Sequence, residues 1–131
     1  MEAPAFKTLL RFAAGAEVGT GVLAIASPSL FTRLLFGLDL SSPGPGVARL
    51  GGFALLALAV ACWPTRDSAA GPPLRAMLLF SVLCAAYLIW RGIRGGATGP
   101  LLWPAAALHT ALALLLARAW QRERALRTGA P

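Results

Sequence analysis

Residues 5–26, AFKTLLRFAAGAEVGTGVLAIA, form an apolar run long enough to cross a bilayer as one α-helix, with Glu17 near its centre. A carboxylate at mid-membrane depth is costly, so it indicates a functional site with a partner elsewhere in the chain. A cleaved signal peptide is the alternative for this run, because Ala24-Ile25-Ala26 imitates a cleavage site. Glu17 inside the apolar region argues against cleavage, and we expect a retained helix.

The rest of the chain repeats this pattern. Three further apolar blocks cover residues 47–63, 74–90 and 100–118, each close to the length that a bilayer core requires. The 131-residue chain is 57% hydrophobic and only 13% charged, which is too apolar for a soluble domain of this size. The sequence therefore predicts an all-α, four-helix transmembrane bundle that forms a single transmembrane domain over residues 1–131.

A short segment between the first two blocks, residues 28–36, has the signals of a separate helix. Ser27 is a good N-cap, Pro28 a good first helical residue and Gly37 a good stop. The segment is too short to span a bilayer, and its apolar side chains recur at helical spacing. We expect a short interfacial amphipathic helix between the first and second spanning helices.

The basic residues predict the orientation in the membrane. The net charge is +7, and the arginines flank the apolar blocks. Basic residues at these positions set the orientation of a membrane protein and contact anionic lipid headgroups, so the charge gives no reason to expect nucleic acid. The positive-inside rule places both termini and the basic tail 118–131 in the cytoplasm, because that side of the bundle holds eight basic residues against four. The eight are Lys7, Arg11, Arg66, Arg75, Arg118, Arg122, Arg124 and Arg127; the four are Arg33, Arg49, Arg91 and Arg94. The abundance of Ala, Arg, Gly and Pro is typical of bacteria with GC-rich genomes, so we expect a bacterial inner membrane.

Two ionisable side chains fall deep in the predicted membrane. Glu17 lies near the midpoint of the first spanning helix and His109 near the midpoint of the fourth. Two isolated polar groups would each be costly there, whereas a hydrogen-bonded pair is far less so. We expect both to face the bundle interior, within reach of each other directly or through water. The groups expected to support them are Thr20, Ser81, Tyr87 and Thr110. Arg49, at the outer end of the second block, either extends to the lipid headgroups or reaches inward to Glu17 or Tyr87.

Glycines provide a second candidate surface. Gly15 and Gly19 form a GxxxG pair in the first block, and Gly51 and Gly52 are adjacent in the second. Small residues at such positions let another helix approach closely. They predict helix packing, either within this chain or with a partner.

Most catalytic and cofactor chemistry is not indicated. The chain has no Walker loop, GxSxG, HExxH or Rossmann fingerprint. Cys62 and Cys84 lie in separate blocks without a CxxC, so neither a disulfide nor a zinc site is expected. Haem would need a second axial ligand beside His109, and Met77 is poorly placed near a helix end. We expect no metal and no cofactor.

One resemblance adds to this interpretation. The pattern SP at residues 27–28, LLFG at 34–37 and VARLGGFALLAL at 47–58 resembles small four-helix membrane proteins of bacteria, of the uncharacterised DUF4345 or DoxX-like sort. Those proteins have a Glu in the first helix, a proline-started interfacial segment and an Arg-x-x-Gly opening the second helix. The likeness covers roughly the first half of the chain and implies a four-helix bundle. It implies no particular substrate, and His109 is not part of it.

Three functions fit these observations. We favour a non-enzymatic accessory subunit that binds membrane lipids and a membrane-protein partner, or a second copy of itself, through its glycine faces. The rival is a binder of a lipophilic small molecule, quinone- or lipid-like, or a proton-linked carrier, at the Glu17–His109 site; the third is a small transporter acting as an oligomer. An apolar pocket between helices at the depth of Glu17 would favour the rival, and a packed interior with an exposed glycine stripe would favour the accessory subunit.

Overall fold

A computed structural model describes residues 3–65, 71–96 and 98–128, and this part of the chain is entirely helical, with no strand. The helices are α1 (Ala3–Ala26), α2 (Pro28–Phe36), α3 (Gly44–Cys62), α4 (Gly71–Arg94) and α5 (Leu102–Thr128). By length and composition, α1, α3, α4 and α5 can each cross a membrane. The chain is therefore a multi-pass membrane protein, and the short helix α2 lies between the first two spans as predicted.

The ends of the helices differ from the prediction by a few residues. The bounds of α2 agree with it, whereas α3 and α4 each begin three residues earlier than the predicted residues 47 and 74. Prolines stand at the starts of both helices, and a proline is tolerated in a first turn, where its missing N–H has no partner to lose. Helix α5 continues to Thr128 through most of the predicted tail 118–131, because Arg, Ala, Leu, Gln and Glu all favour helix.

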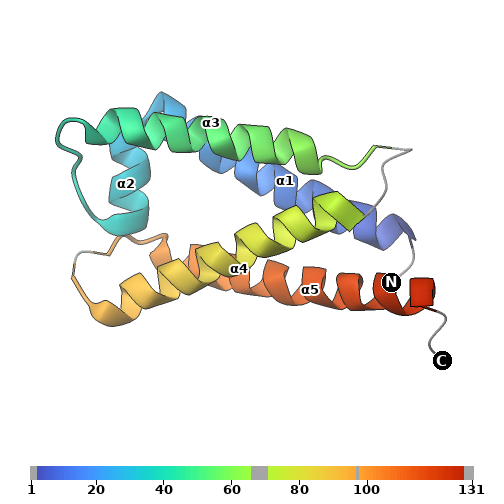
Figure 1. Ribbon diagram of the computed structural model, residues 1–131. Coiled ribbons are helices and arrows are strands. Elements are labelled where there is room, and N and C mark those ends of the chain that lie inside the picture. Colours follow the sequence, from blue (N-terminus) through green and yellow to red (C-terminus); the bar gives the residue numbers. More distant parts are fainter. Residues whose placement is uncertain (1–2, 66–70, 97, 129–131) are drawn as a thin grey trace.

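The four long helices associate as two antiparallel pairs. Helix α1 packs mainly against α3, and α4 packs mainly against α5, with much less contact between the pairs. Figure 1 shows that the pairs come together where α1 begins and α5 ends, and spread apart towards the end that holds α2. The interior is therefore narrow at one end and wide at the other.

The packed core lies at the narrow end. Its buried residues are Leu10, Ala13 and Ala14 of α1, Ala59 and Cys62 of α3, Leu74 and Met77 of α4, and Leu112, Leu116 and Ala119 of α5. All four long helices contribute, so this cluster joins the two pairs. Met77, considered above as a haem ligand, is part of this cluster and is fully buried.

The close approach of α1 and α3 occurs at Gly21 and Gly52. A Cβ on Gly52 would lie 2.7 Å from the carbonyl oxygen of Gly21 and 2.7 Å from Cγ1 of Ile25. Gly52 thus packs as predicted. A Cβ on Gly15, Gly19 or Gly51 would meet nothing within 4 Å, so these three glycines make no close helix contact within the described chain, and their packing against a partner stays a prediction.

This crossing gives a first prediction. We expect Gly52→Leu to lower the free energy of unfolding by about 1–3 kcal/mol, because a side chain there overpacks a backbone contact. The adjacent Gly51→Leu is the control, since its side chain would enter open space. Unfolding in mixed micelles, followed by circular dichroism, measures both. Equal stability of the two variants would contradict the observed register of α1 and α3.

Helix α2 is fixed at both of its ends. Ser27 separates it from α1, and at its other end the backbone N–H groups of Gly99 and Leu101 donate to the carbonyls of Leu35 and Leu34, at 3.3 and 2.8 Å. These bonds satisfy carbonyls that a helix C-terminus leaves free. As a result α2 connects the α1–α3 pair to the loop between α4 and α5, and it lies across the wide end, roughly perpendicular to the long helices (Figure 1).

Candidate ligand pocket

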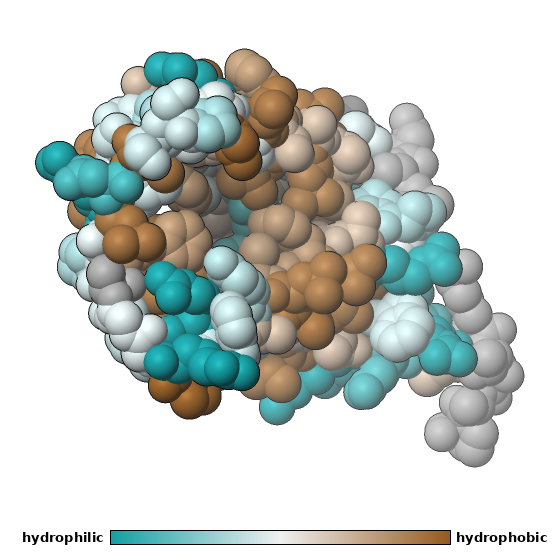
Figure 2. Space-filling view, turned by 60° about the vertical axis from the view of Figure 1, so that its left-hand side comes forward, coloured by the Kyte–Doolittle hydropathy of each residue, from teal (hydrophilic) through white to brown (hydrophobic). Residues whose placement is uncertain are grey.

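A cavity of about 870 Å³ occupies the wide end of the molecule, between the two helix pairs. All five helices or their adjoining residues line it. In the view of Figure 2 the surface is hollowed at this end, with hydrophobic residues to the right of the hollow and more hydrophilic residues to its left. The packed core at the narrow end and the cavity at the wide end therefore divide the interior into two halves.

The walls of the cavity are almost entirely apolar. They are formed by Leu23, Phe31, Leu34, Leu35, Phe36, Leu55, Phe80, Leu83, Leu88, Leu101 and Leu108, together with small residues of α1, α3 and α5. Gly19 and Gly51 also line it, and each faces open space. These two glycines keep the cavity open on the α1–α3 side instead of packing helices together.

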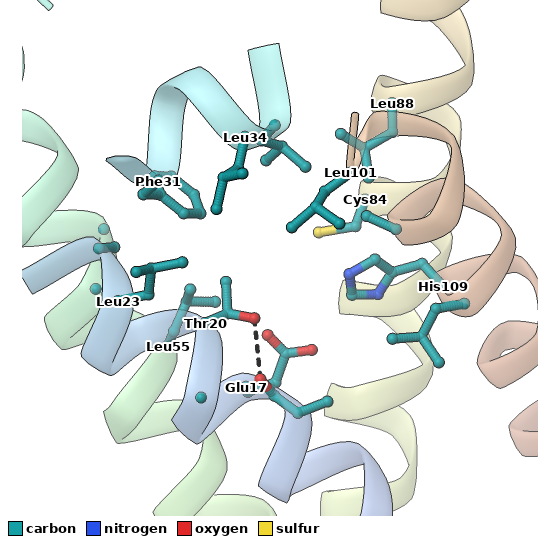
Figure 3. A pocket seen from close by; sticks show the side chains of 18 of the residues that line it. Glu17, Thr20, Leu23, Phe31, Leu34, Leu55, Cys84, Leu88, Leu101 and His109 are labelled. Carbon is teal, nitrogen blue, oxygen red and sulfur yellow. Dashed lines mark hydrogen bonds between the residues drawn. The ribbon is translucent and has the colours of Figure 1, made fainter. Parts of the chain in front are cut away.

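Polar groups gather where the cavity meets the packed core. Glu17 lies one turn beyond Ala13 and Ala14 of the core, and its side chain is only 2% exposed. His109 lies one turn before Leu112 of the core, on α5. Figure 3 shows the carboxylate and the imidazole projecting into the cavity from α1 and α5, with the Cys84 sulfur between α4 and the cavity. The structure thus brings the two predicted residues to one site.

Glu17 and His109 face the same cavity but do not bond to each other. In the described part of the chain no hydrogen bond or ion pair joins them, and Nδ1 of His109 is buried without a partner. The His109 ring contacts Phe80 edge to face, with centroids 5.7 Å apart. A buried nitrogen without a partner and a buried carboxylate that makes no hydrogen bond in the described chain are both costly, which is typical of a site whose partner is a ligand or water.

The predicted supporting groups are mostly engaged elsewhere. Thr20 lines the cavity, and its hydroxyl donates to the carbonyl of Ala16 at 2.9 Å; the Thr110 hydroxyl donates in the same way to Ala106 at 2.7 Å. Such bonds to the preceding turn satisfy the hydroxyl within its own helix. Ser81 is different, because its buried hydroxyl has no partner.

Tyr87 and Arg49 lie further from the polar end. Tyr87 lines the cavity but is 51% exposed, and its ring packs against Phe36 and Trp90. Arg49 is exposed and donates from Nε to the carbonyl of Ile25 at 3.3 Å. The alternative in which Arg49 reaches inward to Glu17 or Tyr87 is therefore wrong: the arginine stays at the outside of the α1–α3 crossing.

A second, smaller hollow lies beside α2. It measures about 560 Å³, is formed largely by the α2–α3 loop, and shares Phe31, Phe36 and Ala48 with the main cavity. At its rim Arg33 pairs with Asp39, and both side chains are exposed. The hydrogen bond to Asp39, with the charge of that carboxylate, raises the pKa of Arg33, so the guanidinium remains cationic. Neither hollow was predicted from the sequence.

The site does not have the composition of a metal centre. No group of three or more His, Cys, Asp and Glu side chains that could hold a metal ion occurs in residues 3–65, 71–96 and 98–128. The cavity instead resembles a small-molecule site in chemical terms: it is concave and mostly apolar, with a few polar groups at one end.

Comparison with family models, curated proteins and solved structures finds no match to this chain. The resemblance to DUF4345 or DoxX-like proteins stays a prediction.

Proposed function

We propose that this protein is a small bacterial inner-membrane protein that binds a lipophilic molecule with a polar head group in the cavity between its helix pairs. The observation that supports this most directly is the cavity of about 870 Å³, because it is apolar along its walls and ends at Glu17 and His109. Pockets that bury drug-sized ligands measure roughly 300–1,000 Å³. Of the functions considered above, this is the one that an open interior favours.

In the proposed arrangement the four long helices form a transmembrane bundle with both termini in the cytoplasm. The excess of Arg and Lys at the narrow end supports this orientation by the positive-inside rule. Helix α2 then lies in the outer interface, parallel to the membrane plane. The head group of the ligand would sit near mid-membrane depth, with its apolar body directed towards the outer leaflet.

The proposal is tested by co-purification. The protein is purified in mild detergent and analysed by native mass spectrometry and lipid extraction, as wild type, Glu17→Gln and Gly19→Leu. Gly19 lines the cavity and faces open space, so a leucine there occupies ligand volume without disturbing helix packing. We expect a bound small molecule or lipid in the wild type and its loss in both variants.

A matched control lies one turn earlier on the same helix. Gly15 also faces open space but is not among the residues that line the cavity, so Gly15→Leu should keep the ligand. Identical spectra for the wild type and all three variants, without any bound molecule, would contradict the proposed function.

An accessory, partner-binding role is the second candidate. It is favoured by the exposed face at Gly15, where small residues leave room for a helix of another protein or of a second copy. Gly15→Leu separates this role from ligand binding. If the glycine face is an interface, the variant shifts the mass of the assembly on native gels while the ligand content stays unchanged.

A further inference from the structure

The charge of the cavity is the feature that narrows the choice of ligand. Among the described residues that line it, the ionisable side chains are Glu17, Cys84, Tyr87 and His109, and none is a lysine or arginine. The two arginines near its outer end are engaged outside it, Arg33 with Asp39 and Arg49 with the Ile25 carbonyl. Among the described residues that line the cavity, an ionised Glu17 therefore has no permanently charged cation beside it, and His109, which can become cationic, makes no bond to it.

A carboxylate in such surroundings needs a positive partner. Glu17 is 2% exposed, makes no hydrogen bond in the described chain, and lies among apolar side chains. Burying an unpaired charge is expensive, and it becomes acceptable when the group takes up a proton or when a cation sits beside it. Proton and cation then compete for the same carboxylate.

The walls add a second observation that points to a cation. Phe31 and Phe36 of α2 and Phe80 and Tyr87 of α4 line the cavity. Aromatic faces attract organic cations, most strongly when water is excluded, and apolar substituents of the cation fit against the leucines between them. A neutral lipid tail would gain from the leucines but not from the carboxylate.

We infer that the ligand is a lipophilic monocation, an amine or onium with apolar substituents, which binds Glu17 in competition with a proton. This inference rests on the proposed function, since it specifies the ligand of the same cavity. The cation replaces the proton on the Glu17 carboxyl, and the proton returns to water.

The groups that face Glu17 decide how the binding depends on pH. Among the residues that the structure describes, the titratable group that lines the cavity from α5 is His109, those from α4 are Cys84 and Tyr87, and α2 and α3 contribute none. Lowering the pH protonates Glu17 and His109, and both changes disfavour a cation, so affinity falls as the pH falls.

Two probes of nearly equal size and opposite charge test the inference. Tetraphenylphosphonium and tetraphenylborate are titrated by calorimetry into detergent-solubilised protein, with ubiquinone-1 as a neutral lipophile. We expect the wild type to bind the phosphonium in preference to the borate. Glu17→Gln should lower the phosphonium affinity at least about tenfold, because one partner of a desolvated charge pair is removed. Glu17→Asp should restore part of the binding.

A histidine variant isolates the source of the pH dependence. His109→Gln removes the imidazolium but keeps a hydrogen-bonding group, so phosphonium binding and its weakening at low pH should both persist. Thermal unfolding of each variant shows that loss of binding does not result from loss of the fold. Gly15→Leu again serves as the unaffected control.

Two other results of these titrations would contradict the inference, and they differ in whether the proposed function survives. If the borate or ubiquinone-1 binds as tightly as the phosphonium, and Glu17→Gln changes nothing, the cavity binds lipophiles but the cation inference is wrong. If no probe binds at any pH, and the native mass spectra of Gly19→Leu are identical to those of the wild type, the proposed function fails together with the inference.

Discussion

Replacing Gly99 with alanine is expected to detach α2 from the loop between α4 and α5. Gly99 is buried, and a Cβ there would overlap the backbone carbonyl oxygens of Arg33 and Leu34. Backbone atoms cannot rotate away as a flexible side chain can. We expect a loss of about 1–3 kcal/mol from overpacking, with about 1 kcal/mol more for each of the bonds from Gly99 and Leu101 to α2 that breaks.

The two cysteines report this change without any label being engineered. Cys84 lines the cavity and is half-buried, whereas Cys62 is fully buried in the packed core. A membrane-permeant maleimide should modify Cys84 several-fold faster in Gly99→Ala than in the wild type, with Cys62 as the internal reference. Gly46→Ala is the control, because a Cβ at Gly46 meets nothing within 4 Å. An unchanged Cys84 rate with unchanged stability would show that α2 does not close the wide end.

The helices of this protein could be predicted because their signals are local. The lengths of the apolar runs predict the four long helices, and Ser27, Pro28 and Gly37 predict the bounds of α2. How the helices pair is not a local property. Apolar residues occur on all sides of these helices, so nothing in the sequence distinguishes Gly52, where a Cβ would meet α1, from its neighbour Gly51, where a Cβ would enter open space.

For the candidate site, too, the individual residues could be predicted from the sequence but their arrangement could not. Glu17 and His109 could be singled out because ionisable groups inside a membrane are costly and need an explanation. The cavity could not be predicted, because a leucine that lines it and a leucine that faces lipid are the same residue in the sequence. Helix α2 lines it, and α2 is held by backbone bonds from Gly99 and Leu101, which have no side-chain signature.

Replacing Glu17 with leucine is expected to stabilise the ligand-free protein, although it abolishes the site. The carboxyl is buried, and no hydrogen bond or ion pair to it occurs in the described chain. Exchanging an uncompensated buried ionisable group for an apolar one should raise the free energy of unfolding by about 2 kcal/mol. A Glu17–His109 clamp that fixes helix register predicts the opposite sign, a loss of about 1 kcal/mol.

A double-mutant cycle separates these two interpretations. Since no bond joins Glu17 and His109, the effects of Glu17→Leu and His109→Leu on the free energy of unfolding in mixed micelles should add within about 0.5 kcal/mol. Coupling of about 1 kcal/mol or more, with each single variant less stable than the wild type, would instead identify a structural clamp. Stability gained by removing a polar group is the pattern expected of a functional site, where the fold tolerates an unpaired residue because a ligand completes it. The sign of the change in the free energy of unfolding caused by Glu17→Leu therefore distinguishes a ligand-binding site from a structural pair that stabilises the helix packing.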